Sequence, residues 1–114
     1  MTSLEVTVAR LAVEYWKLLR TLNRAITSVP EEARERFASQ AGYAAAQLEI
    51  ILKEQNTSIE TFDGLDFEVN LPASPVNGDE FKDTNAIVER TIEPAVIRDM
   101  RVVLPGKVLL AERI

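Results

Sequence analysis

The chain has 114 residues, the length of one ordinary domain or of two small units that depend on each other. Apolar residues make up 46% of it and charged residues 27%, which excludes wholesale disorder and a membrane-embedded protein. The absence of Cys and His excludes disulfides, thiolate nucleophiles, zinc-thiolate sites and the commonest general base. We therefore expect no catalytic residues, no cofactor and no metal, and a protein that is not an enzyme.

The net charge of −5 belongs entirely to the second half of the chain. Residues 1–56 hold seven basic and seven acidic residues, whereas residues 57–114 hold six basic and eleven acidic residues. A nucleic-acid surface needs a basic stripe, so we expect no nucleic-acid partner. The acidic segment 60–83 suits either a basic protein partner or a solvated loop. Without an apolar run long enough for a bilayer or a secretory signal, we expect no membrane association and a cytoplasmic protein.

An apolar repeat of seven residues runs through the first segment. Its members are spaced alternately by four and three residues, as in the a and d positions of a coiled coil. A second apolar stripe lies beside it and includes Ala9, Ala12, Trp16, Leu19 and Ile26. A single helix with so wide an apolar face is unstable alone in water, so we expect it to pack within the chain and against a second copy. The predicted dimer-interface residues are Leu4, Val8, Leu11, Tyr15, Trp16, Leu18, Leu22 and Leu48.

A second helix is predicted to start near 27-TSVPEE-32 and to run to about Gln55. Ser28 and Glu31 have the spacing of a capping box, and Pro30 falls in the first turn, where its missing N–H is harmless. Gly42 costs a helix about 1 kcal/mol relative to Ala, which predicts close packing at that position. Residues 1–56 are thus predicted to form a helical hairpin, half of a dimeric four-helix bundle.

Residues 57–114 are predicted to form a small β domain with about four short strands, which makes the fold class α+β. An extended passage begins at Thr57, and a half-buried strand is predicted over Phe67, Val69 and Leu71, which alternate with polar residues. The prolines in 72-PASP-75 restrict a sheet there to its edge. Two longer strands are predicted over residues 86–97 and 101–112, joined by a turn at 98–100.

Four motifs in order resemble the GrpE family of nucleotide exchange factors. The segments 17-KLLRTLNRAI-26 and 47-QLEIILKEQNTSIETFDG-64, with Gly42, resemble the helical part of that family. The segments 67-FEVNLPASPV-76 and 101-RVVLPGKVLLA-111 resemble its β part. The chain departs from the family at Pro72-Ala73-Ser74-Pro75, where members carry His-Glu-Ala, and at Leu104, where members carry Arg. The resemblance covers roughly residues 17–112 and implies the fold more directly than the partner-binding surface.

The resemblance implies a homodimer whose β domain opens the nucleotide-binding domain of a DnaK-type chaperone and releases ADP. Such a mechanism needs only a surface that binds one state of the partner better than another. Met100, at the tip of the last predicted hairpin, is the favoured contact because an apolar tip has little core to enter. The alternative is a GrpE-like adaptor without exchange activity that binds another protein. The predicted partner-binding residues are Asn70, Leu71, Val76, Asp99, Met100, Arg101 and Leu104.

Overall fold

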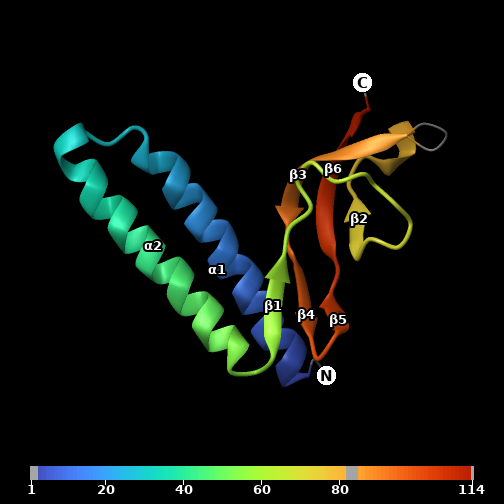
Figure 1. Cartoon of the computed structure of the whole chain (residues 1–114), viewed down its shortest axis with the longest axis horizontal. Helices are drawn as coiled ribbons and strands as arrows, with labels where there is room; N and C mark the ends of the chain where they lie inside the picture. The colour runs from blue at the N-terminus through green and yellow to red at the C-terminus, as the bar shows by residue number, and fades with distance from the viewer. Residues whose placement is uncertain (1–2, 82–84, 114) are drawn as a thin grey trace. The chain divides into compact units, whose positions relative to one another are not determined.

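The computed structural model describes residues 3–81 and 85–113 (Figure 1). It divides into two compact units, Met1–Ser58 and Ile59–Ile114, so the boundary falls two residues beyond the predicted one. Two long helices come first, and a small β region follows them. The α+β fold class with an N-terminal helical hairpin is thereby confirmed.

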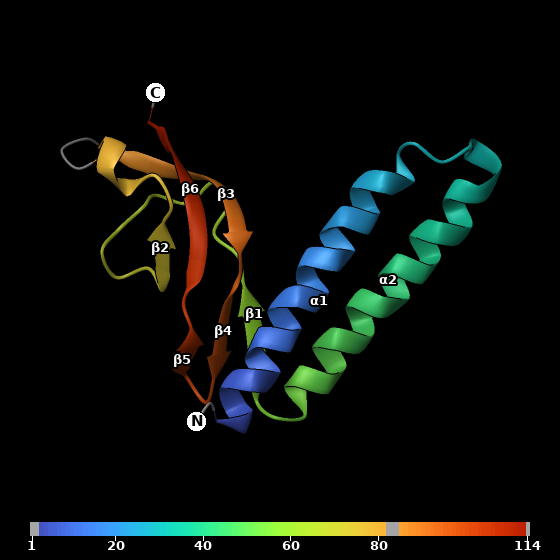
Figure 2. The same cartoon turned by 180° about the vertical axis from the view of Figure 1, so that it is seen from behind.

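The helical unit consists of α1 (Leu4–Ile26) and α2 (Glu31–Lys53), which lie side by side and run antiparallel (Figure 2). Ser3 caps α1, because its side-chain oxygen accepts a hydrogen bond of 3.1 Å from the N–H of Val6. Farther along, the hydroxyl of Tyr15 donates to the carbonyl of Ala44 at 2.9 Å. This bond between the helices fixes which residues of α1 lie level with which residues of α2.

The connection between the helices differs from the predicted capping box. The N–H of Ser28 donates to the carbonyl of Ala25, so Ser28 continues the end of α1 and cannot cap α2. Pro30 is the N-cap instead, without a side-chain hydrogen bond. Arg34 stabilises the connection from the first turn of α2, since its guanidinium donates to the carbonyl of Val29 at 3.0 Å. The prediction of the cap at Ser28 is therefore wrong, although the helix starts in the predicted region.

The β unit contains two sheets of three strands each. The strand order is β1-β4-β5 in one sheet and β2-β6-β3 in the other. More strands are present than predicted because Pro94 and Pro105, which lack an N–H, each divide a long predicted strand in two. The elements of the described chain are β1 (Thr57–Glu60), β2 (Ala73–Pro75), the 3₁₀ helix η1 (Gly78–Phe81), β3 (Ala86–Glu93), β4 (Ala95–Arg98), β5 (Arg101–Leu104) and β6 (Gly106–Glu112).

The segment from Phe67 to Leu71 is not a strand, contrary to the prediction from its alternating pattern. A turn forms there instead, in which the N–H of Leu71 donates to the carbonyl of Glu68 at 3.1 Å. Val69 is fully exposed in this turn. The strand of this region is β2, which lies at a sheet edge and pairs parallel to β6, as the prolines predicted.

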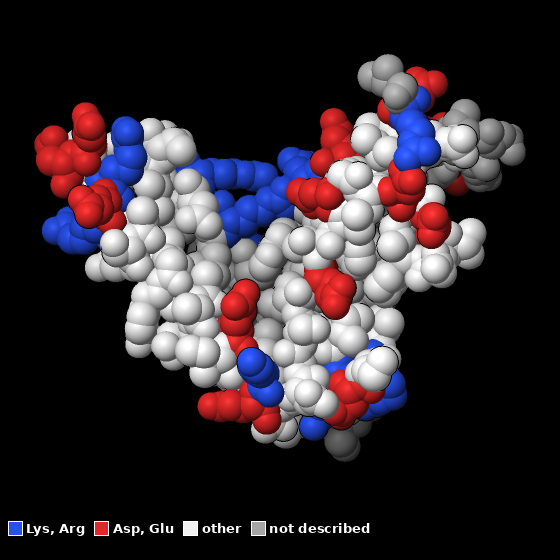
Figure 3. Space-filling model, viewed as in Figure 1, with Lys and Arg blue, Asp and Glu red and all other residues white. Residues whose placement is uncertain are grey.

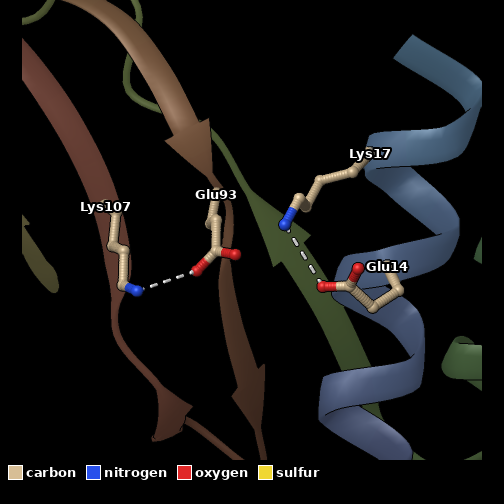
Figure 4. Close-up of polar contacts among 4 residues, drawn as sticks. All are labelled: Glu14, Lys17, Glu93 and Lys107. Atoms are coloured by element: carbon tan, nitrogen blue, oxygen red, sulfur yellow. Dashed lines mark hydrogen bonds and ion pairs between the residues drawn. The ribbon is translucent and has the colours of Figure 1, made fainter. Parts of the chain in front are cut away.

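Asn77 continues the pairing of β2 with β6 after the backbone of β2 ends. Its side-chain amide donates to the carbonyl of Leu110 at 3.0 Å, and its side-chain oxygen accepts from the N–H of Leu110 at 2.9 Å. Both hydrogen-bonding groups of one β6 residue are thus satisfied by a single side chain. On the other side of β6, Lys107 and Glu93 form an ion pair of 3.5 Å between β6 and β3 (Figure 4).

The core of the β unit collects apolar side chains from several strands and from the segment after β1. Thr91 is the buried polar residue among them, and its hydroxyl accepts a hydrogen bond of 2.9 Å from the N–H of Phe62. The carboxylate of Asp63 accepts a hydrogen bond of 2.7 Å from the N–H of Thr91. These bonds fix the chain after β1 to β3. The buried cluster comprises Phe62, Ala86, Val88, Ala95, Val108 and Leu110.

The two glycines of known surroundings give opposite predictions for replacement by alanine. A Cβ at Gly106 would lie 2.8 Å from the carbonyl oxygen of Glu93 and 3.0 Å from the backbone nitrogen of Ala95. We expect Gly106→Ala to lower the free energy of unfolding by about 2 kcal/mol, because the backbone must shift. The measurement is urea unfolding followed by circular dichroism.

Gly42→Ala is the matched control. A Cβ at Gly42 would meet no atom of the described chain within 4 Å, so the predicted close packing is not found within the protomer. We expect this replacement to raise the free energy of unfolding by up to about 1 kcal/mol through helix propensity. An equal loss of stability in both variants would contradict the close approach at Gly106.

Candidate protein-binding surfaces

The predicted dimer-interface residues of α1 form an exposed apolar row. Leu4, Leu11 and Leu18 are 78%, 66% and 71% exposed, and their seven-residue spacing puts them on one side of the helix. Val8 and Tyr15 are exposed between them. The second stripe turns inward, because Ala9, Ala12 and Ile26 are buried. The two apolar stripes of α1 therefore have different roles, one inside the protomer and one on its surface.

Three other predicted interface residues are less available. Trp16 and Leu22 are half-buried, and Arg20 stacks over the Trp16 ring at 5.2 Å from its centroid. Leu48 is buried within the single chain. Leu48 therefore packs inside the protomer, and the surface of the hairpin is supplied by other residues.

Helix α2 adds exposed apolar side chains to the same hairpin. The Tyr15 to Ala44 bond and the antiparallel direction place Val8 level with Ile51, seven residues away on each helix. Ile51 is exposed, as are Ile50 and Tyr43, which are seven residues apart on α2. Isolated exposed apolar residues are normal on soluble proteins, but a set of this size marks an interaction surface. We call the eight residues Leu4, Val8, Leu11, Tyr15, Leu18, Tyr43, Ile50 and Ile51 the hairpin apolar set.

Charged side chains of the hairpin gather where α1 and α2 are joined. Figure 3 shows acidic and basic groups crowded together at that end, on the face drawn. The start of α2 supplies both signs, with Glu31, Glu32 and Glu35 beside Arg34 and Arg36. The hairpin apolar set thus begins away from this end, at the other ends of the helices.

The turn between β4 and β5 presents the second surface. Arg98 and Arg101 are paired across the hairpin, so the turn itself consists of Asp99 and Met100 alone. Their φ angles are 51° and 64°, the left-handed region that a two-residue type I′ turn requires and that Gly or Asn normally occupies. Met100 is 97% exposed. The structure therefore brings together three of the predicted partner-binding residues, Asp99, Met100 and Arg101, at one tip.

The other predicted partner-binding residues lie away from this tip. Asn70 and Val76 are exposed, whereas Leu71 is half-buried and packs against the core cluster. Leu104 is half-buried at the end of β5, where it pairs with Val96 of β4. It is four residues from Met100, which corresponds to about 13 Å along an extended strand. The predicted set is therefore two groups and not one continuous surface.

Sequence reasoning overlooked Arg98 and Val102 as members of the tip. Val102 is exposed and pairs with Ile97, and Arg98 lies directly opposite Arg101. The signal for both was present: a turn of only two residues places the flanking residues face to face. Assigning residues 98–100 to the turn, as the sequence analysis did, concealed this pairing.

No protein-family model, curated protein or solved structure matches this chain. Among the described residues, neither helix is both long and apolar enough to cross a membrane. Within residues 3–81 and 85–113, no cluster of three or more acidic side chains is placed to hold a metal ion. What remains for chemical interpretation are the hairpin apolar set and the tip of the β4–β5 hairpin.

The tip allows a direct measurement of the strain in its turn. Replacing Met100 by Gly removes the clash that a side chain suffers at positive φ. We expect Met100→Gly to raise the free energy of unfolding by about 1 kcal/mol, measured by urea unfolding. Met100→Leu keeps a Cβ of similar size and should leave stability unchanged. Equal stability of all three proteins would contradict a strained turn.

Proposed function

We propose that this protein is a GrpE-like, homodimeric co-chaperone that promotes ADP release from a DnaK-type chaperone. The observation that supports self-association is the exposed row Leu4, Leu11 and Leu18 on α1. Covering this row with the same row of a second copy buries it without any further partner, as in a four-helix bundle. The choice of a DnaK-type partner rests on the ordered motifs between residues 17 and 112.

In this proposal the β unit binds the nucleotide-binding domain of the chaperone. Release of ADP follows if the β unit binds the open domain more tightly than the closed one, because binding then shifts the population toward the open state. This role requires a rigid, shaped surface and no reacting side chain. The exposed tip at Asp99 and Met100, held on a buried base at Ala95 and Val96, supports such a role.

A GrpE-like adaptor without exchange activity is the second candidate. The segment in which the chain departs most from the GrpE pattern is 72-PASP-75, and its residues Ala73–Pro75 form β2. The carbonyl of Pro72 also accepts a hydrogen bond from the N–H of Gly106 at 2.9 Å. Because this segment has a structural role, the family's contacts at that place are replaced, which favours a changed partner.

Self-association is tested by placing a charge in the apolar row. Leu11→Glu puts a carboxylate in the centre of the row, and burying it against a second copy costs about 3 to 5 kcal/mol. We expect the wild type to sediment as a dimer at micromolar concentration and Leu11→Glu as a monomer. The control is Val69→Glu, which adds the same charge at a fully exposed position of the β unit and should remain dimeric. A monomeric wild type would contradict the proposed dimer.

Exchange activity is tested with the DnaK-type chaperone of the same organism, loaded with a fluorescent ADP analogue. In stopped flow, we expect the wild type to raise the release rate at least tenfold over buffer, because open-state binding lowers the affinity for ADP. The variant with Asp99, Met100 and Arg101 all replaced by Ala should lose most of this acceleration. No acceleration by the wild type would favour the adaptor, and unchanged acceleration by the variant would place the contact elsewhere.

A further inference from the structure

The end of the β4–β5 hairpin brings two like charges face to face. Arg98 and Arg101 are direct partners across the strands, and like charges in that position destabilise a hairpin. Asp99 offsets part of this repulsion, with its carboxylate 3.8 Å from the Nε of Arg98. At that distance and degree of exposure the contribution of the pair is small. The hairpin is therefore electrostatically unfavourable at the end where it turns.

The same two-residue turn departs from the usual rules in two more respects. Asp99 and Met100 both adopt positive φ, although neither is Gly. Met100 is an apolar side chain left almost completely in water. Local departures from folding rules that bring no gain inside the molecule concentrate at functional sites. Three such departures within four residues assign a role outside the protomer to this tip.

The sign of the charge at the tip is opposite to that of the unit that bears it. Residues 59–114 hold six basic and eleven acidic residues, whereas residues 98–101 hold two arginines and one aspartate. Acidic groups are spread over the β unit on the face drawn in Figure 3. A locally basic tip on an acidic unit favours contact with an acidic surface and repels a basic one.

We propose that the tip of the β4–β5 hairpin binds an acidic protein surface that has an apolar pocket. Met100 enters the pocket, where its flexible thioether side chain adapts to the available shape. The guanidinium groups of Arg98 and Arg101 donate hydrogen bonds to carboxylates at the rim, a pairing that arginine geometry favours. Val102 adds apolar contact beside them. This inference rests on the proposed function, in that it names the chemistry of the partner surface.

A protein partner fits the surroundings of the tip better than a nucleic acid. Phosphate groups also accept hydrogen bonds from guanidinium groups, but nucleic-acid binding requires a basic surface that extends over several phosphates. Here the basic charge is confined to Arg98 and Arg101, within a unit of net negative charge. Met100 also lacks the flat ring on which a base stacks.

The first test uses defined probes and needs no chaperone. The full chain, labelled with ¹⁵N, is titrated by NMR with the capped peptide Glu-Glu-Leu-Glu-Glu, with its analogue Gln-Gln-Leu-Gln-Gln, and with a pentathymidylate. We expect the Glu peptide to shift the amide signals of residues 98–102, and the Gln peptide to shift them at least fivefold less, because carboxylates carry the contact. Equal shifts with both peptides, no shift at the tip, or tighter binding of the oligonucleotide would overturn the proposal.

Matched variants separate the charge from the apolar contact. Arg101→Gln should reduce the affinity for the Glu peptide about fivefold to tenfold, whereas Arg90→Gln removes the same charge from an exposed position of β3 and should leave it unchanged. Met100→Leu should preserve binding and Met100→Gln should weaken it. An equal effect of Arg101→Gln and Arg90→Gln would show that only net charge matters, which would overturn the proposed site.

The same variants are then measured against the nucleotide-binding domain of the DnaK-type chaperone by calorimetry. Binding that is lost with Arg101→Gln and Met100→Gln, and kept with Arg90→Gln and Met100→Leu, supports both the partner and the tip. Binding unaffected by every variant overturns the tip and leaves the proposed function intact. Absence of binding to the chaperone, together with the expected peptide shifts, overturns the proposed function and leaves the acidic partner surface supported.

Discussion

The close approach of the backbone at Gly106 is the constraint on which the β unit depends. At this point the chain passes from β5 to β6, and the chain from β3 to β4 passes directly against it, within contact of the Gly106 Cα. Both passages cross from one three-stranded sheet to the other. Each crossing is marked by a proline, Pro94 or Pro105, because a residue without an N–H suits a place where no ladder bond forms. Only a residue without a side chain lets the two crossings meet.

This arrangement explains why the tip of the β4–β5 hairpin tolerates strain. Its base lies next to the crossing, where Ala95, Val96 and Val108 are completely buried. Burial of these side chains stabilises the base by more than the turn costs, so positive φ at Asp99 and Met100 persists without unfolding the hairpin. A two-residue turn on a buried base also has little freedom to lose when it binds, which favours affinity.

Much of the architecture follows from the sequence, and each failure has a physical cause. The heptad spacing of α1 and the prolines in 72–75 predicted a helix and an edge strand, and both are present. Alternation over Phe67, Val69 and Leu71 predicted a strand, but a turn at Glu68 overrides it, since three apolar residues are too few to fix a register. The pairing of Asn77 with Leu110 joins residues 33 positions apart and leaves no local signal.

The division of α1 into an inner and an outer stripe was likewise hidden in the sequence, because both stripes are apolar. Side-chain volume decides between them. Ala9 and Ala12 are small enough to let the helices approach, so they turn inward and the leucines remain outside. Among the predicted site residues, those at the tip followed from turn chemistry, whereas the burial of Leu48 depended on packing that no local pattern records.

The two candidate surfaces differ in the chemistry by which they avoid non-specific association. The row on α1 is purely aliphatic and aromatic over five residues, which suits an interface that is always covered, since such interfaces resemble a core divided in two. At the tip a single apolar side chain stands between two arginines, a composition typical of contacts that form and dissociate. A protein that keeps a permanent contact with its own copy and a reversible contact with a partner needs this contrast, because a second aliphatic row would also bind the first. The charges at the tip therefore act as much against self-association as for the partner.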